Sequence, residues 1–427
     1  MMLSGNESYR KKCFLQDEGD MMSNSKGINR YVRLAIAFVT MLFAGIIYSW
    51  SILKSPFASE FGWTPSQLAL NFTLTMCFFA VGGLISGFFS KRTGPKIFIF
   101  IGAVIAAVGF VLTSGNTGSI ALLYLTYGVM GGLGIGLAYN PLVSSTNAWF
   151  QDRKGFSSGI MMMGFGASSL VIGNIAASFI EIPEIGWRKT YIILGVAIGV
   201  VLIAAGIFAK LPDSMNQNVK GNVKSSAGEV IKILKTPNFW MFYVYIIAIS
   251  VTGNVVISAA KDIGLSTGMS AALATSLVGI LSIFNAFGRL LSGTLFDKYG
   301  RKLTMTFASS ACIIASALIL LALINQSVVL GIAGLCIAGL SYGFSPTVSS
   351  AVCADFYGPE LFPNIFSIIS TMLIPTSLFA TIVGTMVTVS GSYNGAMILV
   401  IVVSSISLGL SFAIRKPGIS SYKQNNM

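Results

Sequence analysis

Histidine is missing from the whole chain of 427 residues, and charged side chains make up only 10% of it. Without histidine the chain lacks the commonest metal ligand and the usual proton carrier near neutral pH, which excludes a zinc site and a Ser-His-Asp triad. The five cysteines show no paired spacing, so we interpret them as small core residues. We therefore expect no metal, no cofactor and no enzymatic activity.

Long apolar runs dominate the rest of the sequence. Hydrophobic residues make up 54% of it, whereas an ordinary soluble domain is roughly 25% charged. The runs are ~20 residues long, which is the length that a helix needs to cross the hydrocarbon core of a bilayer. We therefore predict an all-α integral membrane protein with twelve transmembrane helices. The predicted spans are residues 31–53, 68–89, 97–113, 120–148, 158–180, 191–211, 239–260, 271–296, 303–324, 328–353, 362–389 and 395–414.

A polar break divides these spans into six and six. It contains four lysines among Gly, Ser and Asn residues, a composition typical of a flexible linker or a surface helix between two bundles. The predicted organisation is an N-terminal tail (1–30), a six-helix bundle (31–211), the linker (212–238), a second six-helix bundle (239–414) and a C-terminal tail (415–427).

Basic residues gather on one side of this predicted topology. If the N-terminus is cytoplasmic, 22 of the 27 Lys and Arg residues fall on the cytoplasmic side, 4 fall on the other side, and Arg289 falls inside a span. This asymmetry predicts that both termini are cytoplasmic, in a cell membrane. Membrane orientation then accounts for the net charge of +13, so we expect no nucleic-acid partner. We also expect the chain to work as a monomer.

The two halves carry matching segments. The loops GFFSKRTGPK (87–96) and GTLFDKYGRK (293–302) place Gly and basic residues in the same order, 206 positions apart. Such a duplication is a common plan in transporters, where the substrate binds near the membrane midplane between the halves. Three further pairs lie 203 positions apart, namely Tyr139 and Tyr342, Asp152 and Asp355, and Gly155 and Gly358.

Arg289 is the candidate for the central chemistry. It precedes Asp297 by eight residues, so on a helix it lies ~12 Å deeper in the membrane than that loop. A charge at such depth normally lines an aqueous path and meets a partner, yet every acidic residue falls in a loop, in a tail or at the end of a span. The substrate itself is one candidate partner, since a guanidinium binds a carboxylate through two hydrogen bonds. The alternative is that Arg289 snorkels or binds backbone carbonyls.

Three tyrosines and an asparagine complete the candidate substrate site. Asn285 lies one turn before Arg289, on the same helical face. The tyrosines are candidates for the walls and hydroxyl donors of a cavity, although buried tyrosines are also typical of plain packing. These residues are Tyr48, Tyr139 and Tyr342.

The loop at residues 293–302 resembles the loop signature of the major facilitator superfamily, through Gly293, Asp297, Lys298, Gly300, Arg301 and Lys302. The N-terminal copy departs from that signature, with Lys91 where an Asp is usual. We predict that Asp297, Arg301 and Lys302 hold one closed state by charge pairing and contacts with helix ends.

Four other segments resemble the oxalate:formate antiporter family, which is related to the monocarboxylate transporters. They are IYSWS (47–51), GLGIGLAY (132–139), WFQDRKG (149–155) and NAFGR (285–289). The likeness covers residues 29–414 and implies the major facilitator fold, with two six-helix bundles.

The resemblance also implies roles for two positions. In that family the basic residue of the eighth span, here Arg289, binds anionic substrate, and the oxalate carriers have a lysine in the eleventh span. Met372 lies at or near the position of that lysine, and residues 362–389 contain no Lys or Arg. One fixed positive charge suits a monoanion, so we predict a secondary active transporter of monocarboxylates that works by alternating access, through exchange or proton-linked symport. The alternatives are an exporter of drugs or neutral solutes, a transporter-like solute sensor and a membrane enzyme.

Overall fold

The computed structural model describes residues 29–63, 65–212 and 223–416, and all regular elements within these ranges are helical. The first half contains α2 (Arg30–Ala44), η1 (Gly45–Ser49), α3 (Trp50–Leu53), α4 (Ser55–Phe61), α5 (Pro65–Thr93), α6 (Pro95–Ser114), α7 (Ile120–Leu123), η2 (Tyr124–Gly131), α8 (Gly132–Asn147), α9 (Lys154–Ser168), η3 (Ser169–Gly173), α10 (Asn174–Glu181) and α11 (Gly186–Phe208). The second half contains α13 (Val223–Leu234), α14 (Pro237–Ser266), α15 (Ala271–Asn325), α16 (Val328–Ser370), α17 (Leu373–Ser390) and α18 (Asn394–Ala413).

The helix α15 reverses its direction halfway along. A straight helix of its 55 residues would be ~80 Å long, against a hydrocarbon core of ~30 Å. Instead, Gln326 at its end donates a hydrogen bond from Nε2 to the carbonyl of Ser266, just before its start, at 3.2 Å. Both ends of α15 therefore lie on the same face of the molecule, and the chain turns back at Gly300.

Glycine makes this reversal possible. Gly300 has φ 77° and ψ 177°, a backbone conformation that only glycine adopts without strain. Gly94, its counterpart 206 positions earlier, lies between α5 and α6 with φ 85° and ψ 157°. Gly358 breaks α16 in the same way, with φ 65° and ψ 175°. The 206-residue repeat of Gly94 and Gly300 is thus a repeat of backbone turns, whereas Gly155, the counterpart of Gly358, lies in the first turn of α9 without a positive φ.

The described residues include ten helices that are long and apolar enough to cross a membrane. Two of these stretches, Ala272–Asn325 and Val328–Val387, are 54 and 60 residues long, and each makes two crossings because it reverses at a glycine. The prediction of twelve spans in two groups of six is therefore confirmed. The described part of the polar break between the two groups contains the helix α13.

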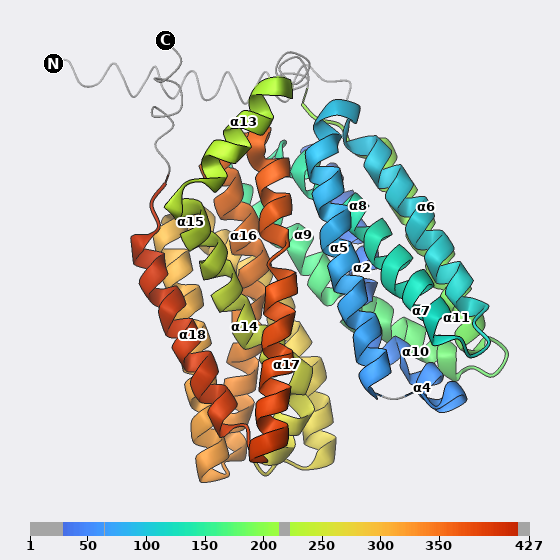
Figure 1. Cartoon of the computed structure of the whole chain (residues 1–427), viewed down its shortest axis with the longest axis vertical. Coiled ribbons are helices and arrows are strands. Elements are labelled where there is room, and N and C mark those ends of the chain that lie inside the picture. Colours follow the sequence, from blue (N-terminus) through green and yellow to red (C-terminus); the bar gives the residue numbers. More distant parts are fainter. Residues whose placement is uncertain (1–28, 64, 213–222, 417–427) are drawn as a thin grey trace.

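The two halves meet near the end of the molecule where α2 begins and α18 ends, and they diverge toward the opposite end (Figure 1). We call this end the terminal face, because α2 begins there and α11 and α18 end there. Here Ser350 of α16 accepts a hydrogen bond from Asn147 of α8 at 3.3 Å and contacts the hydroxyl of Ser158 of α9 at 2.9 Å. Asn147 and Ser350 are themselves 203 positions apart, so equivalent positions of the repeat meet where the halves join.

Glycine pairs let the backbones of the two halves approach closely at this face. A Cβ on Gly293 of α15 would collide with the backbone of Gly155 in α9, and a Cβ on Gly155 would lie 2.8 Å from the carboxylate of Asp297. The passage between the halves is therefore closed at the terminal face by backbone-to-backbone packing.

Candidate functional site

Arg289 lies in the first arm of α15 and is only 3% exposed. Its Nε donates to the side-chain oxygen of Asn285 one turn earlier, at 3.2 Å, and its Nη1 donates to the carbonyl of Met162 in the other half, at 2.7 Å. None of the ion pairs found among the described residues includes Arg289. A buried cation is therefore held in place by neutral groups from both halves.

The space for this guanidinium depends on a glycine in α9. A Cβ at Gly166 would lie 2.7 Å from Nε and 2.9 Å from Cζ of Arg289, which is closer than van der Waals contact allows. The cation Arg289 and its partner Asn285 thus come from α15, whereas its partner Met162 and the glycine that leaves space for it, Gly166, come from α9.

Part of the guanidinium remains available for a ligand. Asn285 occupies Nε–H and Met162 occupies one Nη1–H, so the second Nη1–H and both Nη2–H groups are left over. These groups suit a carboxylate, which accepts paired hydrogen bonds from an arginine fork.

A cavity of about 40 Å³ lies beside Arg289, between the two halves. A space of roughly 10–15 Å³ on this measure is enough for one water molecule, so the cavity has room for a small polar solute. Its walls are aromatic on the N-terminal side and rich in hydroxyl groups on the C-terminal side. The lining residues are Tyr48, Phe79, Tyr139, Phe165, Arg289, Tyr342, Ser345, Pro346, Ser349, Phe366, Ser370, Met372 and Leu373.

The aromatic wall is a connected cluster. The ring of Tyr139 lies 5.1 Å from Phe79 and 5.2 Å from Phe165, both edge-on, and the ring of Tyr48 lies 5.4 Å from Phe165. The Tyr139 hydroxyl donates to the sulfur of Met162 at 2.8 Å. Such interlocked rings give the cavity a fixed shape and exclude bulk water from Arg289.

The structure brings Arg289, Tyr48, Tyr139 and Tyr342 together around one cavity. Asn285 is not part of the lining and supports the guanidinium from behind. Sequence reasoning missed the three serines, although Ser345 and Ser349 follow Tyr342 by three and seven residues and so share its helical face. It also missed the three phenylalanines, because apolar residues within apolar runs carry no signal.

The predicted loop residues lie at the terminal face. The carboxylate of Asp297 accepts backbone hydrogen bonds from Gly155 at 2.9 Å and Phe156 at 2.7 Å. These N–H groups belong to the first turn of α9, where the helix dipole favours a negative charge. Arg301 donates to the carbonyl of Ile414 at 2.8 Å.

Two loop cations have aromatic neighbours instead of acidic ones. The ammonium groups of Lys298 and Lys302 lie over the rings of Tyr299 and Phe412, at 5.2 and 5.4 Å. The predicted contact with a helix end is thus present at Asp297, whereas none of the ion pairs among the described residues joins these loop residues.

Comparisons with known proteins agree with this architecture. The profile of the Major Facilitator Superfamily matches residues 34–374. The oxalate:formate antiporter of Oxalobacter formigenes is 25% identical over 394 residues, which are 91% of this chain and 93% of that protein. Monocarboxylate transporter 12 of Rattus norvegicus is 24% identical over 390 residues, which are 83% of this chain and 78% of that protein. Among solved structures, the transporter FucP in its outward conformation superposes with a TM-score of 0.69 at 15% identity, over 91% of this chain and all of that chain (100%).

Proposed function

Because the chain belongs to the Major Facilitator Superfamily of transporters, we propose that it is a secondary active transporter of small organic anions and that its substrates are monocarboxylates. The observation that carries this proposal is Arg289, a cation 3% exposed beside a cavity between the two halves. An isolated buried charge is costly, and an anionic substrate is the group that lowers this cost. The names of the relatives, an oxalate:formate antiporter and a monocarboxylate transporter, point to the same class of substrate.

The preference for a single negative charge follows from the other residues that line the cavity. Met372 stands where α16 gives way to α17 and lines the cavity, and Arg289 is the one Lys or Arg among the lining residues. A dianion would leave its second carboxylate against a thioether and aromatic rings, where an unpaired charge is strongly disfavoured. A formate-sized or acetate-sized monoanion satisfies Arg289 and leaves no charge unpaired.

Transport proceeds by alternating access in this proposal. The terminal face is the cytoplasmic face of a cell membrane in this scheme, since α2 begins there, α18 ends there, and the basic side chains of Arg30, Arg301 and Lys416 lie there. The structure then represents the state that is closed toward the cytoplasm. Rocking of the two halves would separate the glycine pair at Gly155 and Gly293 and open the cavity to the cytoplasm.

Coupling to a side-chain proton carrier has no support in this chain. The sequence contains no histidine, and no Asp or Glu lines the cavity. Exchange of one carboxylate for another, or a proton that travels on the substrate, fits these residues better. The protein acts in this scheme as a monomer, without a cofactor, a nucleic-acid partner or catalytic activity.

Counterflow in sealed proteoliposomes tests the proposal. Vesicles loaded with formate, lactate, pyruvate, acetate or oxalate are given the same labelled compound outside, and we expect accumulation of at least one monocarboxylate. A solute sensor would bind label without accumulating it, and an exporter of drugs or neutral solutes would exchange none of these acids. Either result would reject the proposal.

A further inference from the structure

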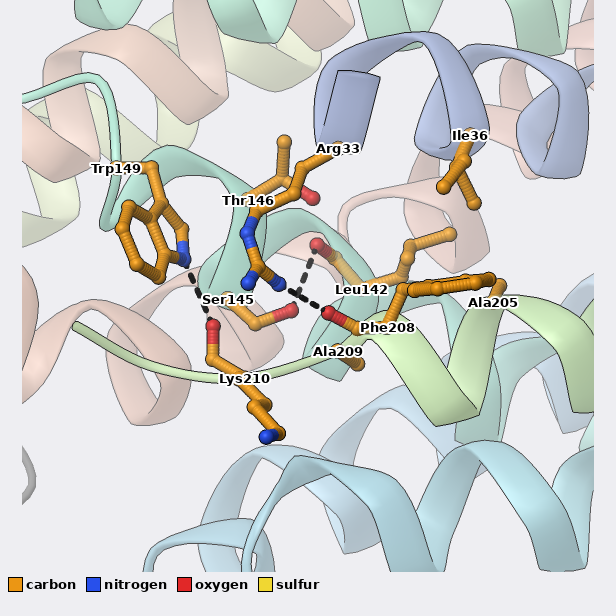
Figure 2. Close-up of a pocket in the computed structure, with 10 residues that line it drawn as sticks. All are labelled: Arg33, Ile36, Leu142, Ser145, Thr146, Trp149, Ala205, Phe208, Ala209 and Lys210. Atoms are coloured by element: carbon orange, nitrogen blue, oxygen red, sulfur yellow. Dashed lines mark hydrogen bonds between the residues drawn. The ribbon is translucent and has the colours of Figure 1, made fainter. Parts of the chain in front are cut away.

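A second pocket lies away from the central cavity, between α2, α8 and α11 at the terminal face (Figure 2). Arg33 is one turn into α2, Phe208 is the last residue of α11, and Trp149 closely follows the end of α8. The pocket thus lies at the level where these helices leave the membrane. Its lining residues are Arg33, Ile36, Leu142, Ser145, Thr146, Trp149, Ala205, Phe208, Ala209 and Lys210.

Arg33 is held in this pocket without an acidic partner. Its Nη1 donates to the carbonyl of Phe208 at 2.5 Å, and its guanidinium stacks over the ring of Trp149 at 4.5 Å. Trp149 is itself fixed, because its Nε1 donates to the carbonyl of Lys210 at 2.8 Å. The Nε of Arg33 is buried and has no hydrogen-bond partner, and none of the ion pairs among the described residues includes Arg33.

The charge around the pocket is positive. Figure 2 shows the guanidinium of Arg33 between the Trp149 ring and the end of α11, and the Lys210 side chain extends from the neighbouring backbone away from Arg33. Lys210 is exposed, so its flexible side chain can reach an anion at the rim. Asp152, three residues after Trp149, is already paired with Arg30 at 2.9 Å. An anion at this rim would therefore meet two cations that no described carboxylate neutralises.

The helices beside the pocket present apolar side chains outward. In α2, Val32 is 48% and Val39 is 44% exposed, and in α11, Ile203 is 42% and Ile207 is 54% exposed. In a membrane protein such exposed apolar residues face the acyl chains of lipids. The pocket thus joins a basic, headgroup-level rim to an apolar outer surface.

The pocket itself, about 10 Å³, has room for no more than about one water molecule, so a larger anion can bind only at its rim. We propose that this rim binds the phosphate of an anionic phospholipid from the leaflet at the terminal face. The phosphate oxygens accept hydrogen bonds from Arg33 and Lys210, and the acyl chains lie along the exposed side chains of α2 and α11. Basic pockets between transmembrane helices are suited to acidic lipid headgroups, and a guanidinium binds phosphate more specifically than an ammonium does. The bound lipid ties the start of α2 to Lys210, close to the point where the chain leaves α11 for the linker, and so braces the N-terminal half.

Native mass spectrometry of the full-length protein tests the proposal. The protein is released from nanodiscs that contain phosphatidylcholine with a minor fraction of phosphatidylglycerol, and the bound lipid is counted. The variants are Arg33→Gln, Arg33→Lys and, as a matched control at the same face, Arg153→Gln, whose side chain is 61% exposed. Arg33→Gln loses a direct charge-assisted hydrogen bond to the phosphate, so we expect it to bind phosphatidylglycerol roughly tenfold more weakly. Arg153→Gln should bind it as the unmodified protein does.

Each of these measurements supports or contradicts the proposed lipid site. Equal retention of phosphatidylglycerol in Arg33→Gln and the unmodified protein would overturn the proposal. Glycerol phosphate, added as a soluble competitor, should leave the bound lipid in place, and its binding in place of the lipid would show a site for free phosphate. If Arg33→Gln fails to fold, Arg33→Lys decides, because it keeps the charge but loses the stacked fork. Binding by that variant as tight as in the unmodified protein would contradict the role of Arg33.

Discussion

Replacing Gly166 with alanine should disturb substrate binding without removing any polar group from the site. The new Cβ would lie 2.7 Å from Nε, 2.9 Å from Cζ and 3.2 Å from Cδ of Arg289. An ordinary contact begins at 3.4 Å, so the guanidinium must move by about 0.7 Å. Such a shift weakens its bonds to Asn285 and Met162, which now measure 3.2 and 2.7 Å, and turns the free N–H groups away from the substrate.

The expected change in KM follows from the hydrogen bonds that the shifted guanidinium would lose. A hydrogen bond to a charged group is worth about 1.5–3 kcal/mol, so the loss of one such bond to substrate raises the KM for exchange roughly ten- to a hundredfold. The assay is the concentration dependence of carboxylate counterflow in proteoliposomes. Gly409→Ala is the matched control, since a Cβ on Gly409 in α18 meets nothing within 4 Å and should leave KM unchanged. A Gly166→Ala protein that folds and exchanges with an unchanged KM would refute the placement of Arg289 in the binding site.

Three further changes test other parts of the account. Met372→Lys places a second cation at the cavity wall and should raise the ratio of oxalate to formate exchange at least ~10-fold, while Met372→Leu should leave that ratio unchanged. An unchanged ratio in the lysine variant would argue against the explanation that one cation selects monoanions. Asp297→Asn weakens two charge-assisted bonds to the first turn of α9, each worth about 1.5–3 kcal/mol. The terminal face should then open more often, so a cysteine at Ser349 in the cavity should react faster with an impermeant reagent added from that face. A constant labelling rate would contradict the gating role of Asp297. Gly300→Ala forces a side chain onto φ 77° at a strain of about 1–3 kcal/mol, so the melting temperature of the purified protein should fall below that of Gly409→Ala, and equal melting temperatures would contradict the backbone argument.

Residues with a charge, a ring hydroxyl or a backbone requirement were the ones that the sequence could reveal. Arg289 stands out because a cation in an apolar run demands an explanation, and the 206-residue spacing between Gly94 and Gly300 marks two turns with the same backbone conformation. The length of the apolar runs was likewise enough for the twelve spans, because bilayer thickness fixes that length.

The sequence could not predict the contacts that hold Arg289 and complete the walls of the cavity. Gly166 resembles any other helical glycine until its distance to Arg289 is known, and Phe165 and Phe366 differ in no way from lipid-facing phenylalanines. The bond from Arg289 to the Met162 carbonyl joins residues 127 positions apart, and its acceptor is a backbone group that every residue has. Such contacts depend on how the two halves dock, which no local pattern encodes.

Counterflow of labelled monocarboxylate with Arg289→Gln and Arg289→Lys, beside the unmodified protein, tests the central claim most directly. The account predicts that exchange disappears in the glutamine variant and survives weakly in the lysine variant, with all three proteins folded and inserted to the same extent. Exchange by the glutamine variant at the rate of the unmodified protein would contradict it.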